Sequence, residues 1–294
     1  MSPETALVAG RWLQDASVML LWGGCAYLAA LVPRALAGVA HLRLAGLWTA
    51  LAATGVAATV AMLPLEAATI GNGWRDALDP ATLRAVLFET AVGRAWLVQG
   101  VLALLLALAL ALPSRVRRPV LAPLSGLLLA SLALRGHAAM HSGWLGVAHH
   151  VNDAVHVLCA GAWLGALVPL LPILSALAQP ARRLEAVAAL RRFSTAGHAA
   201  VALVLASGVV NTWLVLGRWP ADWASRYQAL LALKIAVVAA MVALAVFNRY
   251  GLVPRLGRQR PGTLGAIRRA VGLEIVLGLA AVALVASFGM LEPA

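Results

Sequence analysis

Eight long apolar segments limit what this chain can fold into. Each is close to or above the length of about 20 apolar residues that a helix needs to cross a membrane. A backbone in hydrocarbon has no water to satisfy its polar groups, so each segment must be helical. The sequence therefore predicts an all-α polytopic membrane bundle of eight transmembrane helices. The segments lie at about 7–32, 44–65, 95–112, 120–138, 150–176, 197–217, 229–249 and 268–290.

The composition excludes the ordinary classes of soluble protein. Hydrophobic residues make up 62% of the chain and charged residues 12%, which leaves too little polar surface to cover a soluble core. The formal net charge is +12, but the arginines lie between apolar runs rather than on a basic, aromatic face. We therefore expect no nucleic-acid partner, and instead basic loops that stay on the cytoplasmic side and can contact anionic lipid of the bilayer.

The seven connectors alternate between arginine-rich and balanced or uncharged. Arginine-rich connectors are retained in the cytoplasm, so the alternation predicts that both termini lie outside it, in the periplasm. The first apolar run has no basic region before it, so we expect a retained span rather than a cleaved signal peptide. The arginine-rich connectors are 33–43, 113–119, 177–196 and 249–269.

We expect one transmembrane domain over residues 1–294, with a weak internal repeat of four spans. Trp22-Gly23-Gly24 in the first span is similar to Trp163-Leu164-Gly165 in the fifth, which would divide the chain at about 7–138 and 150–290 as a parallel repeat. Chance similarity in an alanine- and glycine-rich chain is the alternative. In the fifth span, Pro169 and Pro172 predict a kink or an early stop.

Histidines gather in one short region. Five of the seven lie between residues 137 and 156. His149, Asp153 and His156 are spaced i, i+4 and i+7, which places them on one helical face. Cys159 continues that stripe. Imidazole, carboxylate and thiolate are ligands of first-row transition metals, with imidazole and sulfur favouring copper or zinc.

The predicted metal site lies at the outward end, between the fourth and fifth spans. His137 and His156 are its core ligands, and Asp153 either binds the metal or fixes an imidazole tautomer. His141 or Met140 completes the site, and His149 is a further candidate whose alternative is an uninvolved residue near water. Ionisable residues within spans are functional candidates, and those that could line a transport path are Asp15, Glu66, Cys159, Lys234, His198 and Glu274.

Several short motifs then resemble one family. Gly136-His137-Ala138, Asp153-x-x-His156, Trp163-Leu164-Gly165, Leu233-Lys234 and Asn248-Arg249 occur in that order, and together they resemble the CopD copper resistance and copper export proteins of bacterial inner membranes. The resemblance implies copper movement across the inner membrane, often with a small periplasmic copper-binding partner of the CopC type.

Function is then expected to be transport rather than enzymatic catalysis. No P-loop, G-x-S-x-G or H-E-x-x-H motif occurs, so nothing indicates ATP-driven pumping or hydrolysis. Ligands for copper, as Cu(I) or Cu(II), are plentiful on the outward side and scarce on the inward side, which favours uptake. The alternative is a haem-binding redox protein, since paired intramembrane histidines can also bind haem iron.

Overall fold

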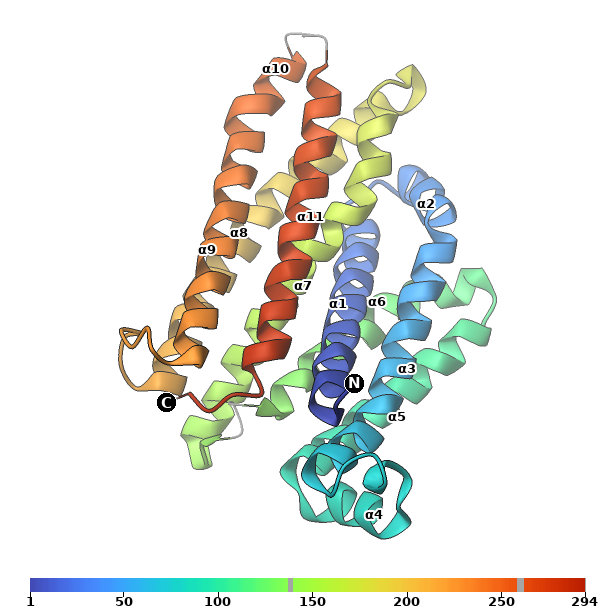
Figure 1. Ribbon diagram of the computed structural model, residues 1–294. Coiled ribbons are helices and arrows are strands. Elements are labelled where there is room, and N and C mark those ends of the chain that lie inside the picture. Colours follow the sequence, from blue (N-terminus) through green and yellow to red (C-terminus); the bar gives the residue numbers. More distant parts are fainter. Residues whose placement is uncertain (137–139, 258–261, 294) are drawn as a thin grey trace.

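The structure, a computed structural model, describes residues 1–136, 140–257 and 262–293 and is helical throughout, with no strand in those ranges (Figure 1). Its α-helices are α1 (Pro3–Ala30), α2 (Arg34–Arg43), α3 (Ala45–Ile70), α4 (Pro80–Glu89), α5 (Ala91–Ala111), α6 (Ser114–Ser131), α7 (Gly143–Ala176), α8 (Arg183–Leu216), α9 (Arg226–Val246), α10 (Val253–Gly257) and α11 (Thr263–Phe288). Short 3-10 turns flank some of them, at Asp76–Leu78, Leu132–Leu134 and Pro180–Arg182, and a π-helical turn, Phe247–Leu252, joins α9 to α10.

The all-α membrane fold is confirmed, and each predicted apolar segment coincides with a long helix. Among the described residues, seven helices are long and apolar enough to cross a membrane: α3, α5, α6, α7, α8, α9 and α11. The helix of the first predicted segment, α1, is not among the seven. It has 28 residues, but Arg11, Gln14 and Asp15 lower the mean hydropathy of its first half.

Helix α1 lies at the centre of the bundle, which explains how it accommodates polar residues. It packs against α3, α6, α7 and α11 (Figure 1). Leu7, Leu21 and Leu28 are almost completely buried along its length. Because other helices rather than lipid surround α1, its polar side chains can find protein partners, as polar groups at membrane depth require.

Helices α1 and α7 cross at glycines. A Cβ atom added to Gly23 would lie 2.0 Å from the carbonyl oxygen of Gly161 and 2.9 Å from the α-carbon of Gly165. Beside them, the indole of Trp22 donates a hydrogen bond of 3.0 Å to the carbonyl oxygen of Leu158. Small residues allow two membrane helices to approach this closely, so the two similar tryptophan–glycine motifs meet at the same crossing.

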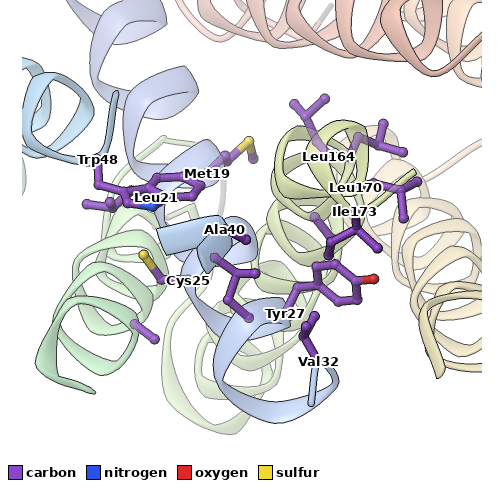
Figure 2. Packing of buried hydrophobic residues seen from close by; sticks show 14 of the residues in the cluster. Met19, Leu21, Cys25, Tyr27, Val32, Ala40, Trp48, Leu164, Leu170 and Ile173 are labelled. Atoms are coloured by element: carbon purple, nitrogen blue, oxygen red, sulfur yellow. The ribbon is translucent and has the colours of Figure 1, made fainter. Parts of the chain in front are cut away.

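One continuous hydrophobic core joins the two halves of the chain. Figure 2 shows α1 residues such as Leu21 and Tyr27 packed near Leu170 and Ile173 of α7 and Trp48 of α3. The Tyr27 hydroxyl donates to the carbonyl oxygen of Ala189 in α8, at 3.3 Å. Cys25 is a buried free thiol in the same core.

Several segments differ from their predicted form. The predicted early stop near Pro169 and Pro172 is wrong, because α7 continues through both to Ala176. A helix that ended within the bundle would leave carbonyl groups unpaired. The predicted connectors also contain helix. Examples are α2 within 33–43, α4 between the second and third predicted segments, and the first residues of α8 within 177–196. At α4, the Asp79 carboxylate accepts from the backbone N–H of Thr82 at 2.8 Å and caps the first turn.

Both ends of the chain lie at one end of the bundle, beside α4 and opposite α2 and α10 (Figure 1). A guanidinium nitrogen of Arg11 in α1 lies 3.4 Å from the carbonyl oxygen of Gly289, which follows α11. We call this the terminal end. The opposite end carries the arginine-rich connectors and is called the arginine end.

Candidate functional site

The first half of α7 carries His149, Asp153 and His156, which we call the histidine ladder. Helix α7 begins at Gly143, seven residues earlier than predicted, so His149 lies within the helix rather than at its entrance. At a rise of about 1.5 Å per residue, His149 and His156 are about 10 Å apart along the helix axis. Asp153 lies between them on the same face. The three therefore form successive steps from the terminal end into the bundle.

His141 and His149 form a pair at the outer step. Their Nδ1 atoms are 3.1 Å apart, and His149 as a whole is only 1% exposed. In this contact one Nδ1 donates and the other accepts. Two imidazoles on a tetrahedral ion, with bonds of about 2.0–2.1 Å, hold their nitrogens about 3.3 Å apart. The pair is therefore spaced as two ligands of one metal ion would be.

His150 has a different role in the structure. Its Nδ1 lies 2.7 Å from the carbonyl oxygen of Ala133. Since a carbonyl only accepts, Nδ1 carries the proton of that bond. This contact ties the start of α7 to the turn after α6.

His156 lies at the inner step, between α7 and α8. Its Nδ1 is 3.0 Å from the hydroxyl oxygen of Ser207. That hydroxyl donates to the carbonyl oxygen of Leu203 at 2.5 Å, so it accepts from the Nδ1–H of His156. The resulting tautomer leaves the Nε2 lone pair for a metal ion, the arrangement typical of metal-binding histidines.

Asp153 belongs to an amide network on the same helix–helix seam. Asn211 of α8 donates to its carboxylate at 2.9 Å. Asn152 in turn donates to the side-chain oxygen of Asn211 at 2.6 Å and to the backbone carbonyl of Ser207 at 3.0 Å. These bonds fix the orientation of the Asp153 carboxylate on the α7–α8 seam.

Two ion pairs lie near the terminal end. Arg135 contacts Asp15 at 3.4 Å, and Arg11 contacts Glu66 at 3.0 Å. All four side chains are less than one-fifth exposed, and Arg135 also donates to the Gln14 amide oxygen at 2.7 Å. Pairing of this kind lowers the cost of placing charge within a membrane protein. Asp15 and Glu66 are thus held by arginines rather than gathered around the histidines.

Lys234 brings a positive charge towards the inner step. Its ammonium group lies 5.9 Å from the centroid of the Phe288 ring. It lies within electrostatic reach of Asp153 and of the His156 ring. Lys234 is the sole lysine of the chain. Its positive charge would repel a metal cation that reached His156.

The remaining candidates lie apart from the ladder. Met140 is 57% exposed, and Cys159 is a partly buried free thiol one turn beyond His156. Towards the arginine end, Glu274 accepts from the Asn248 amide at 2.6 Å, while His198 is exposed and its Nε2 lies 3.4 Å from the Tyr250 hydroxyl. Glu274 and His198 thus have separate partners.

Only part of the predicted metal site comes together in the described residues. His141 meets His149, while Asp153 and His156 share the α7–α8 seam. His137, a predicted core ligand, lies outside the described residues. Within 1–136, 140–257 and 262–293, no group of three or more histidine, cysteine, aspartate or glutamate side chains has the geometry of a metal site.

The sequence analysis missed the residues that orient the ladder. Ser207 and Asn211 lie in the sixth apolar segment, and Asn152 stands next to Asp153. Polar side chains within apolar spans commonly form hydrogen bonds between helices. The two asparagines were therefore a usable signal, but only the fold identifies which residues they serve.

Two family models match the chain. One, described as "Copper resistance protein D-like, N-terminal domain", matches residues 1–147. The other, described as "Copper resistance protein D", matches residues 187–288. No solved structure matches significantly.

Three curated proteins are similar to the chain. Inner membrane protein YebZ of Escherichia coli (strain K12) is 36% identical over 97% of this chain and 98% of its own length. Copper resistance protein D of Pseudomonas syringae pv. tomato is 30% identical over 84% of this chain and 83% of its own. Copper transport protein CutJ of Bacillus subtilis (strain 168) is 31% identical over 83% of this chain, which spans 46% of the longer protein.

Proposed function

Because this chain belongs to the copper resistance protein D family, a family of copper-related function, we propose that it conducts copper ions between periplasm and cytoplasm without ATP. It is a multi-pass protein of the bacterial inner membrane. The observation that carries the proposal is the ladder on α7 together with His141, which precedes the helix: His141 and His149 are spaced as ligands, and Ser207 fixes the ring of His156 deeper in the bundle.

Copper is the cargo in this proposal. An ion first binds at His141 and His149, with Met140 or His137 as further ligands. It then passes to His156 and Asp153, about 10 Å further along α7. A cation entering hydrocarbon loses its hydration at high cost, and the charge of Asp153 offsets part of that loss. Cys159 and Glu274 are the candidates for the onward path, whereas the exposed His198 lies outside the path that we propose.

We further propose that α1 is an eighth span and that the terminal end faces the periplasm. The charges support this orientation, since arginines gather in the connectors of the opposite end. We treat 1–294 as one domain, because α1 packs against helices of both halves.

Topology reporters test this orientation. Reporters inserted after residues 113 and 179, in two arginine-rich connectors, are expected to give a cytoplasmic signal. Reporters after residues 74 and 222, in the balanced connectors, are expected to give a periplasmic one. A periplasmic signal at 113 or 179 would overturn the proposed arrangement.

Direction follows from where the ligands lie. The outer step is close to the terminal end, so loading from the periplasm and uptake are favoured, although a passive path follows the prevailing gradient. Met140 and Trp144, 57% and 88% exposed, flank His141 in sequence and offer a surface on which a periplasmic CopC-type donor could dock. No observation supports the haem alternative, and the names of two of the relatives refer to copper.

Copper titration tests the outer step. His141→Ala and His149→Ala are each expected to weaken copper binding to the purified protein by at least 10–100-fold, the loss typical even of a residue that only orients a ligand. His198→Ala removes an exposed histidine at the other end and should leave the affinity unchanged. Wild-type affinity in both outer variants would contradict the proposed entry site.

A further inference from the structure

Glu274 is a buried carboxyl group in the half of the bundle nearer the arginine end, which we call the inner half. It lies in α11 and is only 3% exposed. The side-chain amide of Asn248 donates to its Oε1 at 2.6 Å. Asn248 belongs to the π-helical turn after α9, and such turns are rare and occur frequently at functional sites.

Within the described residues, no cation forms an ion pair with Glu274. The other acids of the spans differ in this respect. Arginines contact Asp15 and Glu66, and Asp153 lies within electrostatic reach of Lys234. An isolated carboxylate is costly to bury at membrane depth, and a group in that position becomes neutral by taking up a proton.

The amide of Asn248 has an acceptor that such a proton would satisfy. Its side-chain oxygen, Oδ1, is buried and has no hydrogen-bond partner in the part of the chain that the structure describes. An ionised carboxylate only accepts, whereas a protonated carboxyl group has an O–H to donate. An acid and an amide can therefore pair through two hydrogen bonds, one in each direction. Protonation of Glu274 would remove the cost of the unpaired oxygen.

The elements that pack against α11 supply no competing acid or base near Glu274. They are α1, α7, α9, α10 and the π-helical turn. Between the ladder and the arginine end, the titratable side chains of α1, α7 and α9 are Cys25, Tyr27 and Cys159, and thiols and phenols are ordinarily neutral at physiological pH. The remaining ones on these elements and on α11 are exposed at the arginine end: Arg249, Tyr250, Arg255, Arg268 and Arg269.

We propose that Glu274 and Asn248 form a proton-binding site, and that its proton must leave before copper can cross the inner half. The second part rests on the copper path proposed above. Loss of the proton converts the carboxyl group of Glu274 to a carboxylate and releases H⁺ to the cytoplasm. The carboxylate then compensates the charge of the ion, which is otherwise costly to bury. Because protonated Glu274 has no charge, copper flux falls as the cytoplasmic pH falls.

Infrared spectroscopy of the purified full-length protein, without copper, tests the proton site. At neutral pH the wild type should show the carbonyl band of a protonated carboxylic acid. Glu274→Gln should lose this band, while Glu89→Gln, which changes an exposed glutamate in α4, should keep it. In Asn248→Leu the band should move to higher frequency, because the O–H loses its acceptor. An unchanged band in a Glu274→Gln variant that melts at the wild-type temperature would overturn the proton site.

Copper entry into proteoliposomes tests the coupling, with the terminal end outward and the external pH fixed so that the outer histidines keep one state. Entry through the wild type should slow as the lumen is acidified. Entry through Glu274→Gln should be at least about 10-fold slower at neutral pH, because an amide cannot compensate the charge of the ion, and should not respond to lumenal pH.

The two experiments separate the proton site from the copper path. The same response to lumenal pH in wild type and Glu274→Gln would overturn the coupling. No entry through the wild type would contradict the copper path, and with it the coupling. The infrared measurement contains no copper, so it decides the proton site in either case.

Discussion

Replacing His156 with alanine is expected to stop copper passage while leaving copper binding at the outer step intact. His156 presents Nε2 on the α7–α8 seam because Ser207 accepts its Nδ1–H. Without the imidazole, an ion leaving His141 and His149 would find only the Asp153 carboxylate at the inner step and would still meet the positive charge of Lys234. Copper flux into proteoliposomes should therefore fall to the background of protein-free vesicles, while equilibrium binding to the purified variant persists.

Two matched variants separate a ligand role from a structural role. Ser207→Ala keeps the imidazole but removes the acceptor that fixes its tautomer, and should reduce flux by about 10–100-fold, the usual effect of a residue that orients a ligand. His198→Ala removes a histidine outside the ladder and should conduct at the wild-type rate. Wild-type flux through His156→Ala would exclude the inner step from the copper path.

Replacing Gly23 with alanine is expected to lower the free energy of unfolding of the protein substantially. The added methyl group would lie 2.0 Å from the Gly161 carbonyl oxygen, so α1 and α7 would have to separate. Overpacking a core typically costs about 1–3 kcal/mol, and a clash with backbone rather than with a flexible side chain places this substitution at the upper end. The melting temperature in detergent and the monodisperse fraction should both fall.

Gly272→Ala is the control for that substitution. Gly272 lies in α11, and a Cβ atom there would meet nothing within 4 Å. Alanine is favoured over glycine inside a helix by about 0.5–1 kcal/mol, so the melting temperature should stay the same or rise. Equal destabilisation by the two substitutions would show that helix α1 does not depend on the close crossing with α7.

The fold class could be predicted because hydropathy is a local property. Each of the eight apolar segments coincides with a long helix among the described residues, since a membrane allows few other conformations. The short helix α2 and the early start of α7 were not predicted. Both lie outside the apolar segments. Contacts with α1, α3 and α7 stabilise α2, and such contacts between helices cannot be predicted from one segment alone.

The candidate site could be predicted only along one helix. The spacing of His149, Asp153 and His156 follows from helical periodicity. The contact between His141 and His149 depends on the turn at Gly143, whose φ of 62° is available to glycine. The partners Ser207 and Asn211 come from α8, more than 50 residues further along the chain, so sequence spacing carries no information about them.

The central claim is that copper crosses the membrane through this protein without ATP. Its most direct test is copper entry into proteoliposomes that contain the purified wild-type protein and an internal copper chelator, with no nucleotide present. The account predicts saturable entry that is lost in His156→Ala and retained in His198→Ala. An absence of entry, or entry that requires added ATP, would contradict it.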